Sequence, residues 1–92
     1  MVKSLHSKRY TIFREMLAAA REDCGMTQTE LAIHLGKPQS FVSKYESGDR
    51  RLDFTEFAEI AVVLSVDLAQ FIHRYLENVD KGYQFQQKKS SR

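Results

Sequence analysis

The chain has 92 residues, of which 42% are hydrophobic, and its six phenylalanines and four tyrosines can form one small core but not two domains. Its net charge is +2, and its single cysteine excludes an intramolecular disulfide. The longest apolar runs, such as "IAVVL", are too short to cross a bilayer and no charged-then-apolar leader begins the chain, so we expect a cytoplasmic protein without a membrane partner.

Apolar residues recur every three to four positions, and with only one proline and four glycines they predict an all-α chain with short turns. The first predicted helix spans about residues 8–23 and ends before Gly25, which suits a left-handed C-terminal cap. Its inner face is expected to carry Phe13, Leu17, Ala20 and Cys24.

The second predicted helix opens at a capping box, in which the Thr27 hydroxyl and the Glu30 carboxylate satisfy free backbone amides. It stops at Gly36, and its buried residues are expected to be Leu31, Ala32 and Leu35. The third predicted helix begins near Pro38, whose fixed φ suits a first helical turn, and ends at Gly48.

The fourth predicted helix opens at a second capping box, formed by Asp53 and Glu56. The residues that we expect it to turn inward are Phe54, Phe57, Ala58, Ala61 and Leu64. A fifth helix begins near Asp67, with Leu68, Phe71, Ile72 and Tyr75 at helical spacing. We divide the chain into a basic arm (1–7), a helical domain (8–77) and a polar tail (78–92), where "YQFQ" either forms a strand that pairs across a dimer or is disordered.

The charges along the chain are segregated. Residues 1–14, 36–51 and 78–92 carry net charges of +4, +2 and +3, whereas residues 15–35 and 52–77 are acidic. Such segregation favours a protein that offers one side to a polyanion, although lysine-rich ends also serve solubility alone.

One face of the third predicted helix is polar and mostly uncharged. It carries Gln39, Ser40, Ser43, Lys44 and Ser47, while Val42 and Tyr45 lie on the opposite face. A face that only meets solvent would consist mostly of Glu and Lys. These short hydrogen-bonding side chains therefore suggest a specific polar partner.

The stretch "QTELAIHLGKPQSFVSKYESG" (28–48) resembles the helix-turn-helix of the Xre class, the family of the phage repressors and Cro proteins. The residues at positions where this motif requires apolar or small side chains are Leu31, Ala32, Leu35, Gly36, Val42 and Tyr45. With its flanking helices the resemblance covers about residues 8–77, and it implies a compact five-helix lambda-repressor-like DNA-binding domain. Three positions depart from the family pattern: Lys37 replaces an apolar residue, Pro38 a Ser or Thr cap, and Ser65 a glycine.

The resemblance implies that the third helix enters the major groove of double-stranded DNA, where base edges present distinct hydrogen-bonding patterns. Gln39 can bond bidentately to adenine and Lys44 can donate to guanine, while Ser40 and Ser43 act at short range. Phe41, at the edge of this face, either contacts DNA beside the backbone or through a thymine methyl, or packs against a neighbouring helix.

Contacts with the DNA backbone are expected from residues that flank the recognition helix. In the family, the residue at Gln28 lies near phosphate, at the start of the second helix. Lys37, Arg50 and Arg51 can add salt-dependent affinity, although Arg51 can equally pair with a neighbouring aspartate, Asp49 or Asp53. In relatives, the residues at Arg21 and Glu46 form an ion pair that locks the first helix to the third.

The resulting hypothesis is a transcription regulator, a repressor that binds a two-fold operator as a homodimer through Tyr75, Leu76 and Val79. The alternatives are an antitoxin that neutralises a toxin partner and regulates its own promoter, and a protein-interaction module without DNA binding. Enzymatic activity, a cofactor and a metal site are not expected, because His6, His34 and His73 lack ligand spacing and no motif frames a nucleophile.

Overall fold

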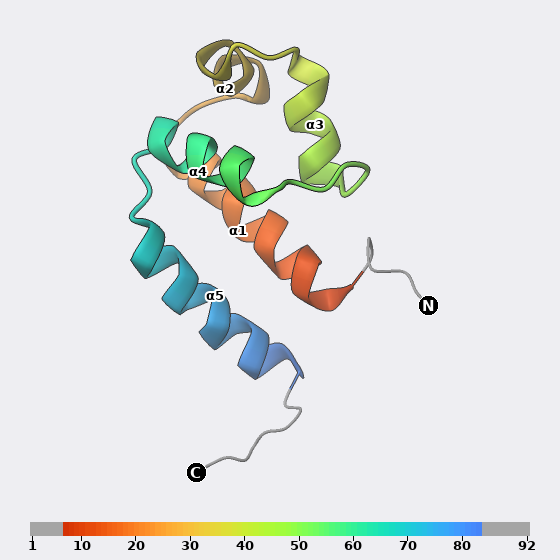
Figure 1. Cartoon of the computed structure of the whole chain (residues 1–92), viewed down its shortest axis with the longest axis vertical. Helices are drawn as coiled ribbons and strands as arrows, with labels where there is room; N and C mark the ends of the chain where they lie inside the picture. The colour runs from red at the N-terminus through yellow and green to blue at the C-terminus, as the bar shows by residue number, and fades with distance from the viewer. Residues whose placement is uncertain (1–6, 84–92) are drawn as a thin grey trace.

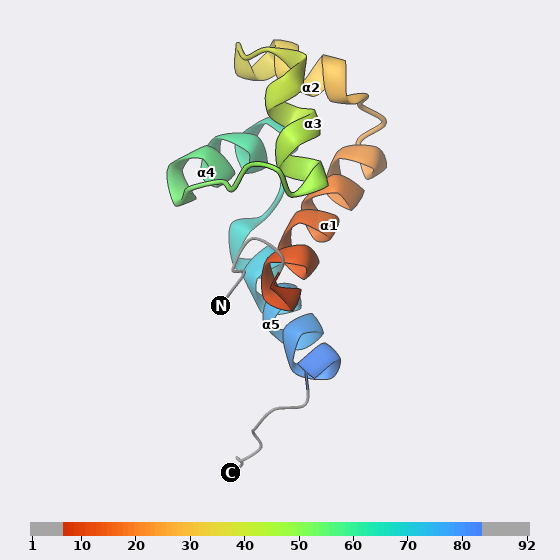
Figure 2. The same ribbon diagram turned by 90° about the vertical axis from the view of Figure 1, so that its right-hand side faces the viewer.

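The computed structural model describes residues 7–83, which form five α-helices and no strand. The helices are α1 (Lys8–Asp23), α2 (Gln28–Leu35), α3 (Gln39–Ser47), α4 (Phe54–Val63) and α5 (Leu68–Tyr83). The all-α, five-helix prediction is therefore confirmed. In Figures 1 and 2, α2 and α3 lie at one end of the molecule, and the C-terminal half of α5 lies at the other.

The helix starts follow from local side-chain chemistry. Ser7 Oγ accepts a hydrogen bond from the Tyr10 amide at the start of α1. Both predicted capping boxes are present: at α2 between Thr27 and Glu30, and at α4 between Asp53 and Glu56. Each box satisfies two backbone amides that the first turn of a helix leaves without an intrahelical partner.

Pro38 does not lie in the first turn of α3, as the sequence had suggested. It is the residue before the helix, with φ −65° and ψ 153°, and it makes no side-chain capping bond. The extended ψ separates it from the helix, because a helical residue needs a negative ψ. Its carbonyl accepts a hydrogen bond from the Phe41 amide, which closes the first turn of α3.

Ser65, predicted to depart from the glycine of the family pattern, follows α4 with a left-handed φ of 58°. The Ser65 amide donates to the Val62 carbonyl at 3.1 Å, and the Val66 amide donates to the Ala61 carbonyl at 2.8 Å. These two bonds are the Schellman pattern, which requires a left-handed residue at this point. A side chain is therefore held in a backbone conformation that normally favours glycine.

The core lies where α1 meets the other helices. Its largest fully buried side chains are Tyr45, Leu17, Leu31, Ile60 and Val42. Rings of Phe13, Phe57 and Phe71 pack on one another with centroids 5.1–6.1 Å apart, which joins α1, α4 and α5. Two predicted inner positions are wrong: Phe54 is 67% exposed and Cys24 is exposed. Ile60 takes the inner position on α4 because the buried face of that helix is rotated away from Phe54.

Helix α5 packs beside α1 and continues to Tyr83. The predicted boundary at residue 77 therefore lies inside a helix, and Val79 is only 5% exposed. Asn78 Nδ2 also donates to Met16 Sδ on α1, at 3.4 Å. The predicted strand "YQFQ" begins at a helical residue, and its remaining positions, 84–86, lie outside the described residues. Within residues 7–83, none of the helices has the length and apolar character needed to cross a bilayer.

Candidate nucleic-acid interface

Helices α2 and α3 pack against each other across a tight turn, and this unit positions the candidate interface. Gly36 ends α2 with a left-handed φ of 68°, and the Lys37 amide donates to the Ala32 carbonyl at 3.0 Å. Ala32 is 1% exposed, so a small side chain is needed where the two helices approach. The turn thus sets the direction in which α3 leaves α2.

The outward face of α3 carries the predicted base-reading residues together. Gln39, Ser40 and Lys44 are exposed and Ser43 is half-buried, whereas Val42 and Tyr45 are fully buried on the inner face. Ser43 Oγ donates to the Ser40 carbonyl at 3.3 Å, which leaves its lone pairs available to a donor. The result is a helix face with a charged amine, an amide and hydroxyls directed to one side.

A chain of hydrogen bonds connects this face to the interior. Gln39 Nε2 donates to Gln28 Oε1 at 3.0 Å, and Gln28 Nε2 donates to Glu46 Oε1 at 2.9 Å. Because Gln28 uses both ends of its amide, its orientation is fixed and it in turn orients Gln39. Gln28 thus has a second role beside the predicted backbone contact: it holds a candidate base-reading side chain.

Arg21 and Glu46 form the ion pair that the family resemblance implies. Arg21 Nε donates to Glu46 Oε2 at 2.7 Å and Nη2 donates to Oε1 at 3.1 Å, with side chains 10% and 9% exposed. The hydrogen bonds that Arg21 donates to Glu46 raise the pKa of Arg21. Arg21 Nη1 also donates to the Met26 carbonyl at 2.7 Å, so one guanidinium joins α1, the α1–α2 turn and α3.

Arg50, a predicted backbone contact, is engaged within the protein. Its guanidinium makes a bidentate pair with Glu56, with Nη1–Oε1 at 3.0 Å and Nη2–Oε2 at 2.8 Å. The hydrogen bonds from Arg50, followed by that from the Asp53 amide, lower the pKa of the Glu56 carboxyl to about 2. This side chain is therefore not simply an exposed cation beside the recognition helix.

Phe41 is 8% exposed and stacks edge-on against Tyr45, with ring centroids 5.7 Å apart. This burial favours the alternative in which the ring packs against a neighbouring helix, and the contact of Phe41 with DNA stays a prediction. The ring had to turn inward because α3 presents positions 41, 42 and 45 to the core. Lys37 Nζ and the Arg50 guanidinium lie over it, 5.2 and 4.7 Å from its centroid.

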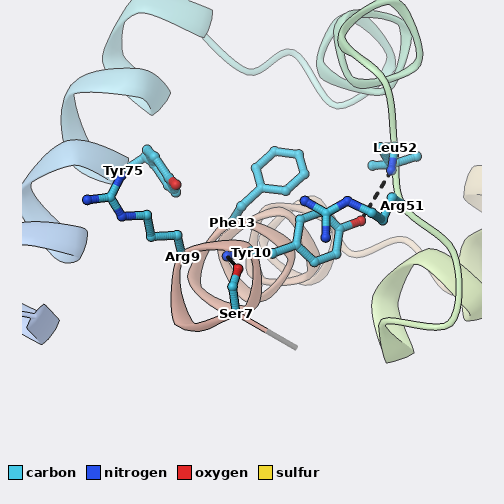
Figure 3. A pocket seen from close by; sticks show the side chains of 7 residues that line it. All are labelled: Ser7, Arg9, Tyr10, Phe13, Arg51, Leu52 and Tyr75. Carbon is cyan, nitrogen blue, oxygen red and sulfur yellow. Dashed lines mark hydrogen bonds between the residues drawn. The ribbon is translucent and has the colours of Figure 1, made fainter. Parts of the chain in front are cut away.

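A second cluster braces the loop between α3 and α4 (Figure 3). Tyr10 Oη donates to the Arg50 carbonyl and accepts from the Leu52 amide, both at 3.2 Å. The Arg51 guanidinium lies 4.1 Å from the Tyr10 ring centroid. A hollow of about 420 Å³ adjoins this cluster, and its other lining residues are Ser7, Arg9, Phe13 and Tyr75.

Three of these structural residues were not identified from the sequence. Tyr10 lies in the first turn of α1 and is 7% exposed, yet its bonds reach residues 40 and 42 positions away. Arg14 donates to the Glu46 carbonyl at 2.6 Å and packs on Gly48, where an added Cβ would lie 3.1 Å from its Nε. Glu56 was assigned only to a capping box, and no local pattern distinguishes a capping carboxylate that also binds an arginine.

The predicted dimer residues fall into two groups. Leu76 is 58% exposed and Tyr75 is half-buried, but Val79 is 5% exposed and belongs to the interior of this chain. The continuation of α5 to Tyr83 accounts for this burial, which leaves Tyr75 and Leu76 as the predicted dimer residues at the surface. Ile72, one turn before Leu76, is 44% exposed and was not predicted. Among residues 7–83, no cluster of His, Cys, Asp and Glu has the composition of a metal site.

Comparisons with known proteins agree with this geometry. A family model described as helix-turn-helix matches residues 17–71. A solved structure described as an XRE-family like protein from Pseudomonas syringae pv. tomato str. DC3000 is 39% identical in sequence, with a TM-score of 0.74. The similarity covers 80% of this chain and 90% of that one. No curated protein matches the chain.

Proposed function

This chain belongs to the XRE family of helix-turn-helix proteins, which are DNA-binding regulators, and from that premise we propose that it is a transcriptional repressor. In this proposal it binds a two-fold operator as a homodimer. The observation that carries the proposal is the outward face of α3, where Gln39, Ser40, Ser43 and Lys44 gather on a helix held by buried contacts on its other side.

Each of these side chains suits a base edge. An amide such as Gln39 can donate to and accept from adenine at once, and an ammonium such as Lys44 can donate to guanine O6 and N7. The two serines, Ser40 and Ser43, reach only a short distance, which fits a helix lying deep in the groove. A reading face needs such discriminating groups more than net charge, because charge alone binds all sequences alike.

Backbone contacts are proposed for three positions around α3. Gln28 lies in the first turn of α2, where free amides and the helix dipole favour a phosphate. Lys37 precedes α3 and is exposed, and Arg51 follows it and is exposed. All three groups would set the register of the domain on the duplex, and the two cations, Lys37 and Arg51, would supply most of the salt-dependent affinity.

The homodimer is proposed to form through α5. Ile72 and Leu76 are one turn apart on the same face and are both exposed, with Tyr75 beside them. A small domain with four base-reading side chains contacts too few base pairs for useful specificity, so a second copy would double the recognised sequence. Two-fold symmetry would then require half-sites about 10 base pairs apart.

Selection of bound sites from random DNA tests the proposal. We expect an inverted repeat with half-sites spaced by about one helical turn, and a complex whose affinity falls steeply with salt. A matched control is the Gln39→Ala, Lys44→Ala double variant, which keeps the fold but should enrich no common sequence. Selection of no sequence by the wild-type chain, at modest salt, would contradict the proposal.

A second function, as an antitoxin that also regulates its own promoter, is favoured by one surface. Val62 is 76% exposed and lines a hollow of about 310 Å³ with His34, Leu35, Glu59 and Val63. This apolar surface on α2 and α4 is separate from the reading face of α3 and is available to a protein partner. A toxin-like reading frame beside the gene, whose product co-purifies with the wild-type chain but not with Val62→Asp, would support this function.

A further inference from the structure

We propose that Arg50 is a positioning residue: it sets the orientation of the recognition helix α3 by bridging Phe41 and Glu56, and it does not contact phosphate. This inference rests on the proposed DNA-binding function. It differs from the sequence-based prediction, in which Arg50 contacts the DNA backbone because it is a basic residue in the loop after α3. Its basis is the set of contacts that converge on this one residue from α1, α3 and α4.

The first contact is the bidentate pair with Glu56. Two parallel hydrogen bonds, at 3.0 and 2.8 Å, match the planar fork of a guanidinium to a carboxylate. Glu56 is itself fixed, because its Oε1 accepts from the Asp53 amide at 3.0 Å in the capping box of α4. The Arg50 side chain is thereby attached to the first turn of α4.

The second contact attaches the same side chain to α3. The guanidinium carbon lies 4.7 Å from the Phe41 ring centroid, a distance suited to a cation–π interaction. Phe41 is buried and packs against Tyr45, which is fully buried, so this ring cannot move without disturbing the core. A rotation of α3 about its axis would separate Phe41 from the guanidinium.

The backbone of Arg50 is also held on both sides. Its amide donates to the Lys44 carbonyl at 3.1 Å, at the end of α3, and its carbonyl accepts from Tyr10 Oη on α1 at 3.2 Å. Nη1 makes a further bond to the Arg51 carbonyl, at 2.9 Å. Three of the five guanidinium N–H donors are thus accounted for inside the protein.

A phosphate contact and a positioning role for Arg50 predict different salt dependences of DNA binding. A cation that binds phosphate displaces counterions from DNA. Its removal makes the negative slope of log affinity against log salt shallower by about 0.9. A cation already neutralised by Glu56 displaces few counterions. Removing it should leave the slope unchanged but weaken the operator complex more than the nonspecific complex, because only base contacts require an accurately oriented α3.

The experiment compares Arg50→Gln with Lys37→Gln, a matched control because Lys37 Nζ lies over the same Phe41 ring, 5.2 Å from its centroid. Affinities for a selected operator and for unrelated duplex DNA are measured by fluorescence anisotropy between about 50 and 200 mM salt. For Arg50→Gln we expect an unchanged salt slope and an operator-to-nonspecific ratio about tenfold lower. For Lys37→Gln we expect a salt slope shallower by about 0.9 and an unchanged operator-to-nonspecific ratio.

Conservative and partner variants complete the test. Arg50→Lys keeps the charge but loses the fork and the planar stack, so it should not restore the ratio. Glu56→Gln should lower the ratio as Arg50→Gln does, and the double variant should be no worse than either, because both remove one bridge. A shallower salt slope for Arg50→Gln, or a full recovery of the operator-to-nonspecific ratio in Arg50→Lys, would overturn the inference while leaving DNA binding intact. A wild-type chain that binds no DNA would instead overturn the proposed function itself.

Discussion

The Arg21 guanidinium and the Glu46 carboxylate form a bidentate ion pair between α1 and α3, with Nε and Oε2 2.7 Å apart. Glu46 Oε1 also accepts from Gln28, so the carboxylate that locks the scaffold also orients an amide next to the reading face. Glu46 therefore contributes both to the stability of the domain and to the proposed recognition of DNA, although its side chain lies behind the surface proposed to contact DNA.

Breaking this pair on one side should strongly destabilise the domain. We expect Glu46→Ala to lower the free energy of unfolding by about 3 kcal/mol, because it leaves the Arg21 charge buried without its partner. Urea denaturation followed by circular dichroism measures this. Glu22→Ala is the control: Glu22 lies 3.7 Å from the same guanidinium with its side chain 69% exposed, and its loss should change stability by less than about 0.5 kcal/mol. Equal effects of the two variants would contradict the prediction.

Base preference should depend on Gln39 and Lys44 individually. Each alanine variant is expected to relax discrimination at particular operator positions by about 1–3 kcal/mol, measured with a panel of single-base operator variants. Gln28→Ala should affect the same position as Gln39→Ala, because Gln28 accepts a hydrogen bond from Gln39 Nε2 at 3.0 Å. Unchanged specificity in the first two variants would show that the assumed orientation of α3 is wrong.

Two buried tyrosines should respond oppositely to loss of their hydroxyl. Among the described residues, Tyr45 Oη has no hydrogen-bond partner, and burial raises the pKa of Tyr45, so its hydroxyl stays protonated and polar. Tyr45→Phe should keep or increase stability, by up to about 1 kcal/mol, since a buried polar group is removed. Tyr10→Phe, which loses two hydrogen bonds, should cost about 1–2 kcal/mol. Thermal unfolding of both variants checks this, and a large loss in Tyr45→Phe would contradict it.

Replacing Ser65 with glycine should stabilise the chain. The left-handed φ of 58° costs a side chain about 1 kcal/mol, which glycine avoids, and part of this gain is offset by the greater freedom of glycine in the unfolded chain. We therefore expect a net gain of about 0.5 kcal/mol in urea denaturation. Ala19→Gly, at an exposed position inside α1, should lose about 1 kcal/mol. A loss of stability in Ser65→Gly would show that its hydroxyl matters more than its backbone.

The stability of the domain should depend on Glu56 in acid. The pKa of Glu56 falls from an ordinary 4.5 to about 2 in the folded chain, chiefly because Arg50 bonds its carboxylate. A lowered folded pKa means that this stabilisation is complete above pH 4.5 and is lost as the pH falls toward about 2. Unfolding titrations of wild type and Glu56→Gln should therefore converge over this window, and parallel curves would contradict the assignment.

Interactions between residues close in sequence determined the helix bounds and the polar face of α3. The helix bounds followed from capping residues, whose effect extends over only a few positions: the capping boxes at Thr27 and Asp53, and the left-handed Gly36. The polar outward face of α3 was predictable as well, because helical periodicity alone places Gln39, Ser40, Ser43 and Lys44 opposite Val42 and Tyr45.

Contacts between segments distant in the chain were decided only by the tertiary structure. Nothing near Arg50 in sequence indicates its pairing with Glu56, which depends on how the loop packs against Phe41 and Tyr10. The same limit explains Phe54 and Val79, whose apolar character showed that each could be buried but not whether another helix would cover it. Periodicity specifies the face on which a side chain lies, whereas the partner of that face depends on how the helices cross.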